Sequence, residues 1–508
     1  MAEVDQAVDA MQGDPSRIST GSRGLDNILG GGLDADRMYL YEGRPGTGKT
    51  TLALQFLREG VRLGQRTLYV TLSESLDELR DVAASHGWSL DGINLLELDS
   101  VSGRLQEEAN YTVYHPSDVE LGETIKRITG EVERLNPERV ALDSVSELKI
   151  LSQTSVRYRR EILGLKQFFA GRKCTVLVLD DRTTREGEQQ LQSIAHGVVR
   201  MERETREYGT TRRQFHIFKL RGIRFQDGLH DFVIHTGGIE VYPRLSASNT
   251  TATVEDEGSA GSGSQELDAL LGGGLDRGSS TLVLGPAGCG KSTLCSQFML
   301  TALVRGESVG CFLFEESRET FLRRSAGYGM DFKPHLASGR LELVQVDIGE
   351  LSPGEFATRV RRMVEQRRVR FIVIDSLNGY LNGMPSERFL LIHLHGLLTY
   401  LGQRGVVTIL TIAQHGMLGS MMLTPVDVSF LADTVVLLRF FEAAGKVRQA
   451  ISVVKKRRGA HERTLREMEI GATGIRIGEV LEQFDGILTG VPRFHGKDAR
   501  LLNAQDES

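Results

Sequence analysis

The chain has 508 residues, of which 40% are hydrophobic and 25% are charged, and its formal net charge is −6. This length exceeds what one hydrophobic core usually organises, so two or more domains are expected. With 61 Lys and Arg residues against 67 Asp and Glu residues, the sequence lacks the global positive field that draws a protein onto nucleic acid or an anionic membrane.

The cysteines and the apolar runs indicate the compartment. Four cysteines without a CxxC pair are too few and too irregularly spaced for a disulfide framework or a zinc site, which favours a reducing cytosol. Residues 1–30 carry acids and lack the apolar run of a signal peptide, and no run of about 18 apolar residues occurs anywhere. We therefore expect a cytoplasmic protein that does not span a membrane.

The two halves of the chain repeat the same motifs. Gly30–Leu33 returns as Gly272–Leu275, and Gly43–Thr50 (GRPGTGKT) returns as Gly285–Ser292 (GPAGCGKS). Both offsets are 242 residues (272 − 30 and 285 − 43), which is the size of a whole domain and too long for a solenoid repeat. We therefore predict two tandem homologous domains.

Composition predicts where these domains begin and end. Residues 246–264 are rich in Ser, Thr, Gly and acids and poor in large apolar residues, as expected of a flexible linker that cannot bury a core. The first domain therefore takes residues 1–245, and the second takes residues 265–496. Residues 497–508 are polar and are expected to form a disordered tail.

Short apolar runs alternate with segments of helical period, in the order expected of a parallel sheet flanked by helices. The first half predicts a helix at residues 50–59 and strands at residues 38–42, 67–72, 140–143 and 175–179. The second half predicts a helix at residues 292–304 and strands at residues 280–284, 309–314, 371–375 and 407–412. Continuous β-branched runs are typical of buried parallel strands. The predicted fold class is α/β.

A glycine loop follows the first strand of each half and precedes a helix. Both loops match the Walker A pattern GxxxxGK[ST], with Lys49 and Thr50 in one half and Lys291 and Ser292 in the other. The glycines let backbone N–H groups face the phosphates of ATP, the lysine neutralises the β and γ oxygens, and the hydroxyl ligates Mg²⁺. A chance glycine turn is the alternative for one match, but two matches in register make it negligible.

Acids end the second and third predicted strands of each half. Asp143 and Asp375 close the third strands, where a carboxylate can hold Mg²⁺ opposite the glycine loop, although strand ends and helix caps also carry such acids. Glu74 follows the second strand in the first half, and Glu315 and Glu316 follow it in the second. These glutamates are candidates to activate the attacking group, with Glu74 equivalent to Glu316. A solvated acidic helix start is the alternative.

A Lys-x-Arg pair follows an apolar strand late in each half. Lys219 and Arg221 form the first pair, and Lys455 and Arg457 form the second. Alternate residues of a strand project to one side, so both cations of a pair can reach one acceptor, such as the γ-phosphate in a neighbouring subunit. This arrangement predicts active sites between subunits. A nucleic-acid patch or a solvated charged run is the alternative for residues 455–458.

Together these residues resemble the KaiC-like family, which comprises RecA-fold ATPases with two tandem domains. The likeness extends from Arg17–Gly21 through Gly24–Asp26 and both glycine loops to Gly490–Pro492. It implies hexameric double rings that bind ATP and Mg²⁺ between subunits, with a slow ATPase in the N-terminal ring. It also implies a C-terminal ring that phosphorylates itself and removes the phosphate. The partner stays open between a KaiB-like protein, a sensor kinase or response regulator, and another protein.

The resemblance also assigns residues to each ATP pocket. The first pocket would contain Gly46, Thr47, Gly48, Lys49, Thr50, Thr51, Ser85, Lys219, Leu220, Arg221 and His235. The second would contain Gly288, Cys289, Gly290, Lys291, Ser292, Thr293, Tyr328, Lys455 and Arg457. Tyr328 takes the place of an aromatic residue that stacks on the base, although an ordinary core or surface tyrosine is the alternative. The register Lys456-x-Arg458 also fits, but Lys455-x-Arg457 keeps His461–Glu462 in step with the family.

Two departures from the family pattern bear on catalysis. The family's clock members phosphorylate an adjacent Ser-Thr pair, and the matching pair here is Ser429–Phe430, so only Ser429 is left as an acceptor, with Asp427 close by. Ser73 stands where the second half has Glu315, so the first site lacks one carboxylate. We predict an ATP-hydrolysing regulatory protein with serine autokinase activity in the second domain, and circadian timing is not part of the prediction. An unmodified interface serine is the alternative for Ser429.

Two other functions stay open at the level of sequence. A RecA-type recombinase or helicase uses the same core on DNA, but it needs basic and aromatic pore loops, and the total charge here is negative. The segment after Asp143 carries Lys149, Arg157, Arg159 and Arg160, and the segment after Asp375 carries only Arg388 before Phe389. DNA binding with a steep salt dependence would favour it. A nucleotide-gated scaffold with negligible turnover would use the same ATP sites, and single-turnover hydrolysis distinguishes it from an enzyme.

Overall fold

The computed structural model describes residues 16–98, 116–152, 154–182, 188–205, 209–245, 258–347, 349–382, 387–414, 429–443, 445–488 and 492–495. The chain divides into two compact units at the boundary between Arg244 and Leu245. Most of the expected linker, Asp427, Gly490–Val491 and the expected tail lie outside the described residues. No helix within the described ranges is long and apolar enough to cross a membrane.

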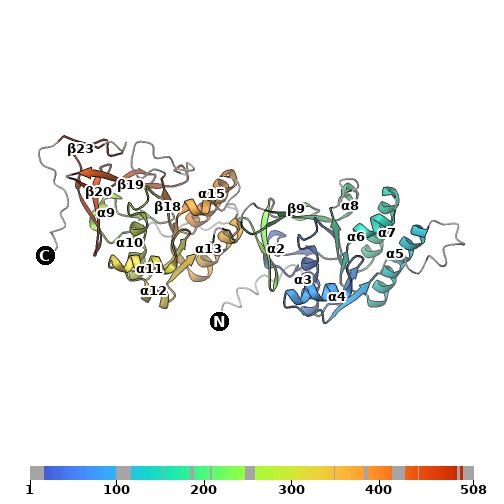
Figure 1. Cartoon of the computed structure of the whole chain (residues 1–508). Coiled ribbons are helices and arrows are strands. Elements are labelled where there is room, and N and C mark those ends of the chain that lie inside the picture. Colours follow the sequence, from blue (N-terminus) through green and yellow to red (C-terminus); the bar gives the residue numbers. More distant parts are fainter. Residues whose placement is uncertain are drawn as a thin grey trace. The chain divides into compact units, whose positions relative to one another are not determined.

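A nine-stranded sheet forms the centre of the N-terminal unit (Figure 1). Its strands are β3 (Met38–Gly43), β4 (Thr67–Thr71), β5 (Ile93–Glu97), β6 (Arg139–Asp143), β7 (Thr175–Asp181), β8 (Gly197–Glu204), β9 (Arg212–Leu220), β10 (His230–His235) and β11 (Gly238–Tyr242). Their spatial order is β5-β4-β6-β7-β3-β8-β9-β10-β11, in which β5 to β8 pair in parallel and β9 to β11 continue antiparallel. A small ribbon pairs β1 (Arg17–Ile18) with β2 (Leu33–Asp34).

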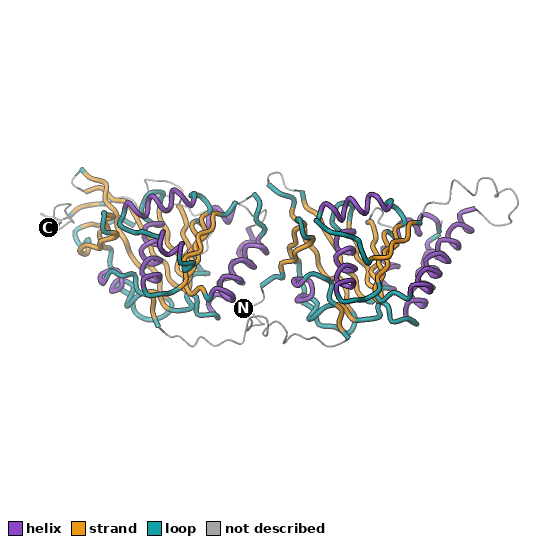
Figure 2. Tube along the Cα trace, turned by 90° about the horizontal axis from the view of Figure 1, so that it is seen from below, coloured by secondary structure: helices purple, strands orange, loops and turns teal. Residues whose placement is uncertain are grey.

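Helices cover both faces of this sheet, because its parallel strands are apolar on both sides (Figure 2). One face packs on α2 (Arg23–Ile28), α3 (Lys49–Arg62) and α4 (Leu76–Ser85). The other packs on α5 (Pro116–Leu135), α6 (Val145–Leu151), α7 (Ser155–Ala170) and α8 (Glu188–Ile194). Two separate hydrophobic clusters result, one on each side of the sheet.

The C-terminal unit repeats the sheet with the same strand order. Its strands are β14 (Ser280–Gly285), β15 (Ser308–Leu313), β16 (Leu341–Gln345), β17 (Val369–Asp375), β18 (Val407–Ala413), β19 (Thr434–Ala443), β20 (Lys446–Lys456), β21 (Arg466–Gly471) and β22 (Gly474–Val480). They lie in the order β16-β15-β17-β18-β14-β19-β20-β21-β22. Two further ribbons pair β12 (Ser259–Ala260) with β13 (Leu275–Asp276) and β23 (Phe484–Asp485) with β24 (Arg493–Phe494).

The helices of the C-terminal unit follow the same plan. One face of the sheet packs on α9 (Gln265–Leu270), α10 (Lys291–Val304), α11 (Arg318–Gly327) and α12 (Lys333–Ala337). The other packs on α13 (Pro353–Arg367), α14 (Leu377–Asn382) and α15 (Glu387–Gln403). Two mostly parallel sheets flanked by helices confirm the α/β class and the tandem RecA-like fold.

One core position distinguishes the two units. Arg139, at the start of β6, is fully buried, and its guanidinium lies 4.6 Å from the ring centre of Phe56. Its Nη1 donates to the carbonyl oxygens of Ser19 (2.8 Å) and Phe56 (2.9 Å). In the C-terminal unit the matching residue is Phe371, which stacks on Phe298. The N-terminal core therefore depends on a buried cation where its repeat uses an aromatic ring.

Arg139→Ala is expected to lower the unfolding free energy of the N-terminal unit by about 3–5 kcal/mol, because it removes the cation and leaves buried carbonyls without their donor. Denaturant titration followed by the fluorescence of Trp88, the chain's only tryptophan, measures this loss. Arg134→Ala removes an exposed arginine of α5 as a control and should change stability little. Equal effects of the two substitutions would contradict the interpretation.

Candidate functional site

The glycine loops have the same shape in both units. Gly46 and Gly48 have φ angles of +77° and +100°, and their counterparts Gly288 and Gly290 have +79° and +97°. These left-handed angles favour glycine, and a Cβ on Gly48 would lie 2.5 Å from Cδ1 of Ile234. Gly48 and Gly290 are the N-caps of α3 and α10, so each loop presents a helix N-terminus suited to a phosphate.

The Walker A lysines are buried, and each folds back over its own loop. Nζ of Lys49 donates to the carbonyl oxygens of Gly43 (2.8 Å) and Arg44 (3.2 Å). Nζ of Lys291 donates likewise to Gly285 (3.0 Å) and Pro286 (2.7 Å). Both ammonium groups are therefore fixed inside the glycine loops.

The acids at the ends of the third strands have different anchors in the two units. Oδ2 of Asp143 accepts hydrogen bonds from the hydroxyls of Thr50 (2.8 Å) and Tyr69. Burial raises the pKa of Asp143, and these two hydrogen bonds oppose the rise. Oδ1 of Asp375 accepts instead from the hydroxyl of Thr411 (2.6 Å). The contact between Thr50 and Asp143 joins the two predicted magnesium ligands of the first site.

The candidate bases also differ between the units. Burial raises the pKa of Glu74, and the nearby carboxylate of Asp143 raises it further. Glu316 is held by Arg324, whose guanidinium makes two hydrogen bonds to it of 3.1 and 3.0 Å. Glu315 is exposed and accepts from the hydroxyl of Ser376 (2.7 Å). Glu74 and Glu315 are therefore the less restrained carboxylates.

The residues predicted beside the loops are brought together in part. The hydroxyl of Thr51 lies 3.2 Å from Nε2 of His86, whose Nδ1 lies 3.1 Å from the carbonyl oxygen of His235. Ser85 is exposed, and its hydroxyl donates to Val82 of its own helix. His86 caps the C-terminus of α4 just as Tyr328 caps α11, so His86 is the positional match of Tyr328.

The remaining loop residues are mostly buried. The hydroxyl of Thr47 donates to the carbonyl oxygen of Arg44 (2.9 Å) and helps to close the first loop. Cys289 is fully buried in the second loop, and burial raises the pKa of its thiol. Thr293 is buried, Ser292 is half-buried, and Tyr328 is half-buried against the core.

The Lys-x-Arg pairs lie at the edge of each sheet opposite to the glycine loops. β9 runs antiparallel to β8, and its end at Lys219–Leu220 pairs with the start of β8, whereas the loop follows the far end of the parallel strand β3. Lys455 pairs with Val435 near the start of β19 in the same way. This shared pairing makes Lys455, and not Lys456, the positional match of Lys219.

These cations bind carbonyl groups at that edge. Nζ of Lys219 donates to Gln192 (2.6 Å) and Ala195 (2.9 Å), and Nη2 of Arg221 donates to Ser193 (3.1 Å). In the C-terminal unit, Lys455 and Arg457 bind the corresponding segment. Nζ of Lys455 donates to the carbonyl oxygens of Ser429 and Ala432 (both 2.8 Å), and Arg457 donates to that of Phe430 (2.6 Å).

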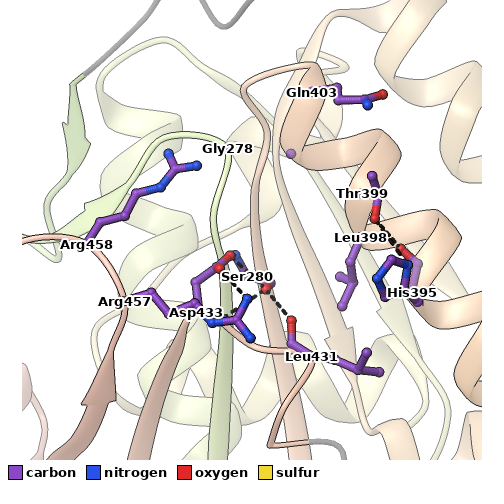
Figure 3. Close-up of a pocket in the computed structure, with 11 residues that line it drawn as sticks. Gly278, Ser280, His395, Leu398, Thr399, Gln403, Leu431, Asp433, Arg457 and Arg458 are labelled. Carbon is purple, nitrogen blue, oxygen red and sulfur yellow. Dashed lines mark hydrogen bonds and ion pairs between the residues drawn. The ribbon is translucent and has the colours of Figure 1, made fainter. Parts of the chain in front are cut away.

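A cavity of about 340 Å³ opens beside the second pair. Arg457 and Arg458 line one side, and His395 and Gln403 of α15 line the other (Figure 3). Asp433 also lines the cavity and forms an ion pair with Arg457 at 3.3 Å. The cavity is therefore polar and holds two arginines at the edge far from the glycine loop of the same unit.

Sequence reasoning missed several residues around the first loop. The most important is Asp181 at the end of β7, whose Oδ1 lies 2.6 Å from Nζ of Lys49. Tyr69 and His86 were also missed, as was Arg203, whose Nη1 would lie 2.9 Å from a Cβ on Gly46. An acid ending the strand beside the Walker A strand was a usable signal for Asp181, but the contacts of the others depend on strand register.

The geometry of the first site fits Mg²⁺–ATP. The loop can receive phosphates only with glycine at its left-handed positions, and Thr50 and Asp143 already contact each other where an oxygen-ligated Mg²⁺ would be held. In the second site the loop and the lysine are the same, and Ser292 and Asp375 are the corresponding oxygen donors.

Comparisons with known proteins agree with this geometry. A family model described as the KaiC ATPase matches residues 18–246 and 260–482, one match in each unit. The chain is 28% identical to the circadian clock protein KaiC3 of Synechocystis sp., over 97% of this chain and 96% of that protein. It is also 28% identical to the circadian clock oscillator protein KaiC of Acaryochloris marina, over 94% and 91% of the two chains. The resemblance inferred from the motifs is thereby confirmed.

Asp180, next to Asp181, provides a test of electrostatics at the end of β7. Burial raises the pKa of Asp180 to about 6, and the hydrogen bond from Ser146 (2.8 Å) opposes the rise. The folded chain therefore binds this proton more tightly than the unfolded chain. The unfolding free energy accordingly falls as the pH rises from about 4 to about 6. Asp180→Asn avoids this loss and should be more stable than the parent at pH 7 by about 1–3 kcal/mol.

Denaturant titrations at several pH values, followed by Trp88 fluorescence, measure the effect of Asp180→Asn. Its stability advantage should disappear below about pH 4, where Asp180 is protonated in both folded and unfolded chains. Asp77→Asn removes an exposed carboxylate of α4 and serves as the control. An advantage of Asp180→Asn that does not vary with pH would contradict the assignment.

Proposed function

Because the chain belongs to the KaiC ATPase family, we propose that it is an ATP-hydrolysing regulatory protein whose nucleotide sites lie between the subunits of a homohexamer. The observation that carries this proposal is the separation of each glycine loop from the Lys-x-Arg pair of its own unit. The two groups lie at opposite edges of one sheet. A pair that cannot reach its own loop is available to the loop of a neighbour.

Within each site the glycine loop would bind the phosphates, and the Walker A lysine would neutralise their charge. Thr50 with Asp143, and Ser292 with Asp375, would hold Mg²⁺, which when bound supplies positive charge to the β and γ oxygens. The raised pKa of Glu74 suits a group that accepts a proton from water at neutral pH. In the second site the exposed Glu315 would take this role, while Arg324 restrains Glu316.

The neighbouring subunit would complete the site with its cations. In the first ring these are Lys219 and Arg221, and in the second they are Lys455 and Arg457. Positive groups placed at the γ-phosphate stabilise the negative charge that develops on it during phosphoryl transfer. The polar cavity beside Arg457 leaves room for an anionic group to approach from outside the unit. A separated subunit would then hydrolyse ATP at full rate at neither of its two sites.

Complementation between two inactive variants tests this arrangement. Lys49→Ala disables the phosphate-binding loop of its own subunit, and Arg221→Ala removes the cation that would reach the neighbour's loop. Both changes are made in a Lys291→Ala background, which silences the second site. Each variant alone should lose most hydrolysis in the N-terminal ring. When the two variants are mixed before assembly, about one quarter of the interfaces pair an intact glycine loop with an intact Arg221. Hydrolysis in the N-terminal ring should then return to about one quarter of the rate without these two changes.

The control is a mixture made after each variant has assembled separately, which should stay inactive. Light scattering or native mass verifies that both variants assemble. Failure of the pre-assembly mixture to recover any hydrolysis, with hexamers present, would refute the intersubunit site.

For the second ring we propose that Ser429 accepts a phosphate from the ATP of a neighbour. The support is its position, because its carbonyl oxygen accepts from Lys455 and the carbonyl of the next residue accepts from Arg457. The acceptor would thus stand beside the cations that reach the neighbour's γ-phosphate. A single acceptor with Phe430 beside it favours a simple phosphorylation switch over the ordered two-site cycle. We propose a regulatory role in the cytosol, read by a protein partner.

Intact mass after incubation with Mg²⁺–ATP tests the autokinase. The parent chain should gain one phosphate, and Ser429→Ala should gain none while it keeps the N-terminal hydrolysis. Ser259→Ala changes an exposed serine elsewhere in the same unit and should behave like the parent. Undiminished phosphate on Ser429→Ala would exclude Ser429 as the acceptor.

A further inference from the structure

The two Walker A lysines have different surroundings although their loops have the same shape. An ammonium group has three N–H donors, and Lys49 directs them at two loop carbonyls and at Oδ1 of Asp181 at 2.6 Å. Lys291 binds the two matching carbonyls, and within the described residues no carboxylate forms an ion pair with it. A Walker A lysine offers its third donor to the terminal phosphate. Among the described residues, this donor already has a carboxylate partner in the first site and none in the second.

Strand register explains the difference. In the N-terminal sheet, Gly43 pairs with Asp181, and in the C-terminal sheet, Gly285 pairs with Ala413. Asp181 and Ala413 therefore occupy equivalent positions, and only the first carries a charge. The Asp181 side chain is 30% exposed while that of Lys49 is 6% exposed, so the carboxylate can turn to solvent while the lysine stays in place.

We propose that Asp181 is an internal counter-ion that competes with the terminal phosphate of ATP for Lys49 and weakens nucleotide binding at the N-terminal site. The proposal rests on the proposed function, because it takes the glycine loop as an ATP site. The two rings would then fill in order as ATP rises, the C-terminal ring first. Asp181 acts through Lys49 and contacts no reacting atom, so it is a positioning residue.

The charges around the first loop indicate that Asp181 competes with the terminal phosphate for Lys49 and does not assist phosphate binding. A carboxylate and a phosphate are both anions, so Asp181 cannot stay against Lys49 when a phosphate oxygen takes the same donor. Once displaced, its charge adds to those of Asp143 and Glu74, and the pKa of Glu74 is raised in part by Asp181. The first site therefore places a carboxylate beside its Walker A lysine where the second site has Ala413, and the bound phosphates meet the charge of that carboxylate.

The chain carries its own reporter for the first site. Trp88, its only tryptophan, lies 4.9 Å from His86 between ring centres, and His86 contacts Thr51 at the start of α3. Titration of the full chain with the non-hydrolysable analogue adenylyl imidodiphosphate and Mg²⁺, followed by Trp88 fluorescence, therefore reads the N-terminal site. Calorimetry in a Lys291→Ala background gives an independent dissociation constant for this site.

Asp181→Asn should tighten binding of the analogue by about three- to tenfold, as expected for loss of a partly exposed charge pair and of one like charge near the phosphates. ADP lacks the terminal phosphate, so its affinity should rise less. Asp181→Glu keeps the charge and should bind like the parent. Asp180→Asn removes the same charge one residue earlier, where the carboxylate faces Ser146, and should leave the affinity unchanged.

The reciprocal variant tests the idea in the other unit. Ala413→Asp places a carboxylate beside Lys291, and in a Lys49→Ala background it should weaken binding of a fluorescent ATP analogue by a similar factor. Tightening by Asp181→Asn together with weakening by Ala413→Asp supports the proposal. Unchanged or weaker binding in Asp181→Asn, or equal tightening in Asp180→Asn, overturns it. A parent chain that binds no nucleotide at either site would instead refute the proposed function.

Discussion

Parallel pairing of β3 with β7 and of β4 with β6 brings the carboxyl ends of four strands to one edge of the N-terminal sheet. The glycine loop, Asp143, Glu74 and Asp181 all follow from that pairing, because parallel strands end on the same side. The arrangement concentrates like charges, and the raised pKa of Glu74 and of Asp143 reflects it together with burial. Mg²⁺, when bound with the nucleotide, would add positive charge to this edge beside the charge of Lys49.

The antiparallel strands that extend each sheet place positive charge at the other edge. Strand β9 reverses direction, so its basic end lies at the far edge, next to the segment that precedes β8. The same reversal in β20 places Lys455 beside Ser429. One sheet thus separates an anion-binding edge from a cation-bearing edge. The proposed intersubunit sites would pair the cation-bearing edge of one unit with the anion-binding edge of the next, which is a head-to-tail contact.

Motifs with a fixed local geometry could be predicted from the sequence, and so could the fold class. Lys49, Thr50 and their repeats lie within one strand-loop-helix unit, so their positions depend on neighbours in the chain. Duplication identified the strands, since each apolar run occurs once in each half and in the same order along the chain.

The contacts that the sequence did not predict all depend on register between distant strands. Asp181 meets Lys49 only because residue 181 pairs with Gly43, and a shift by one residue would put Asp180 there instead. His86, and not Ser85, faces Thr51 because α4 ends at Ser85. Arg139 resembles an ordinary strand-end cation in sequence, and its burial follows from packing between β6 and α3.

Each unit carries its own hydrophobic clusters on both sides of its own sheet. The exchange of arginine for phenylalanine at the start of the third strand shows that the two cores differ in composition within the same architecture. This modular construction permits each unit to diverge in sequence while both keep the same strand order.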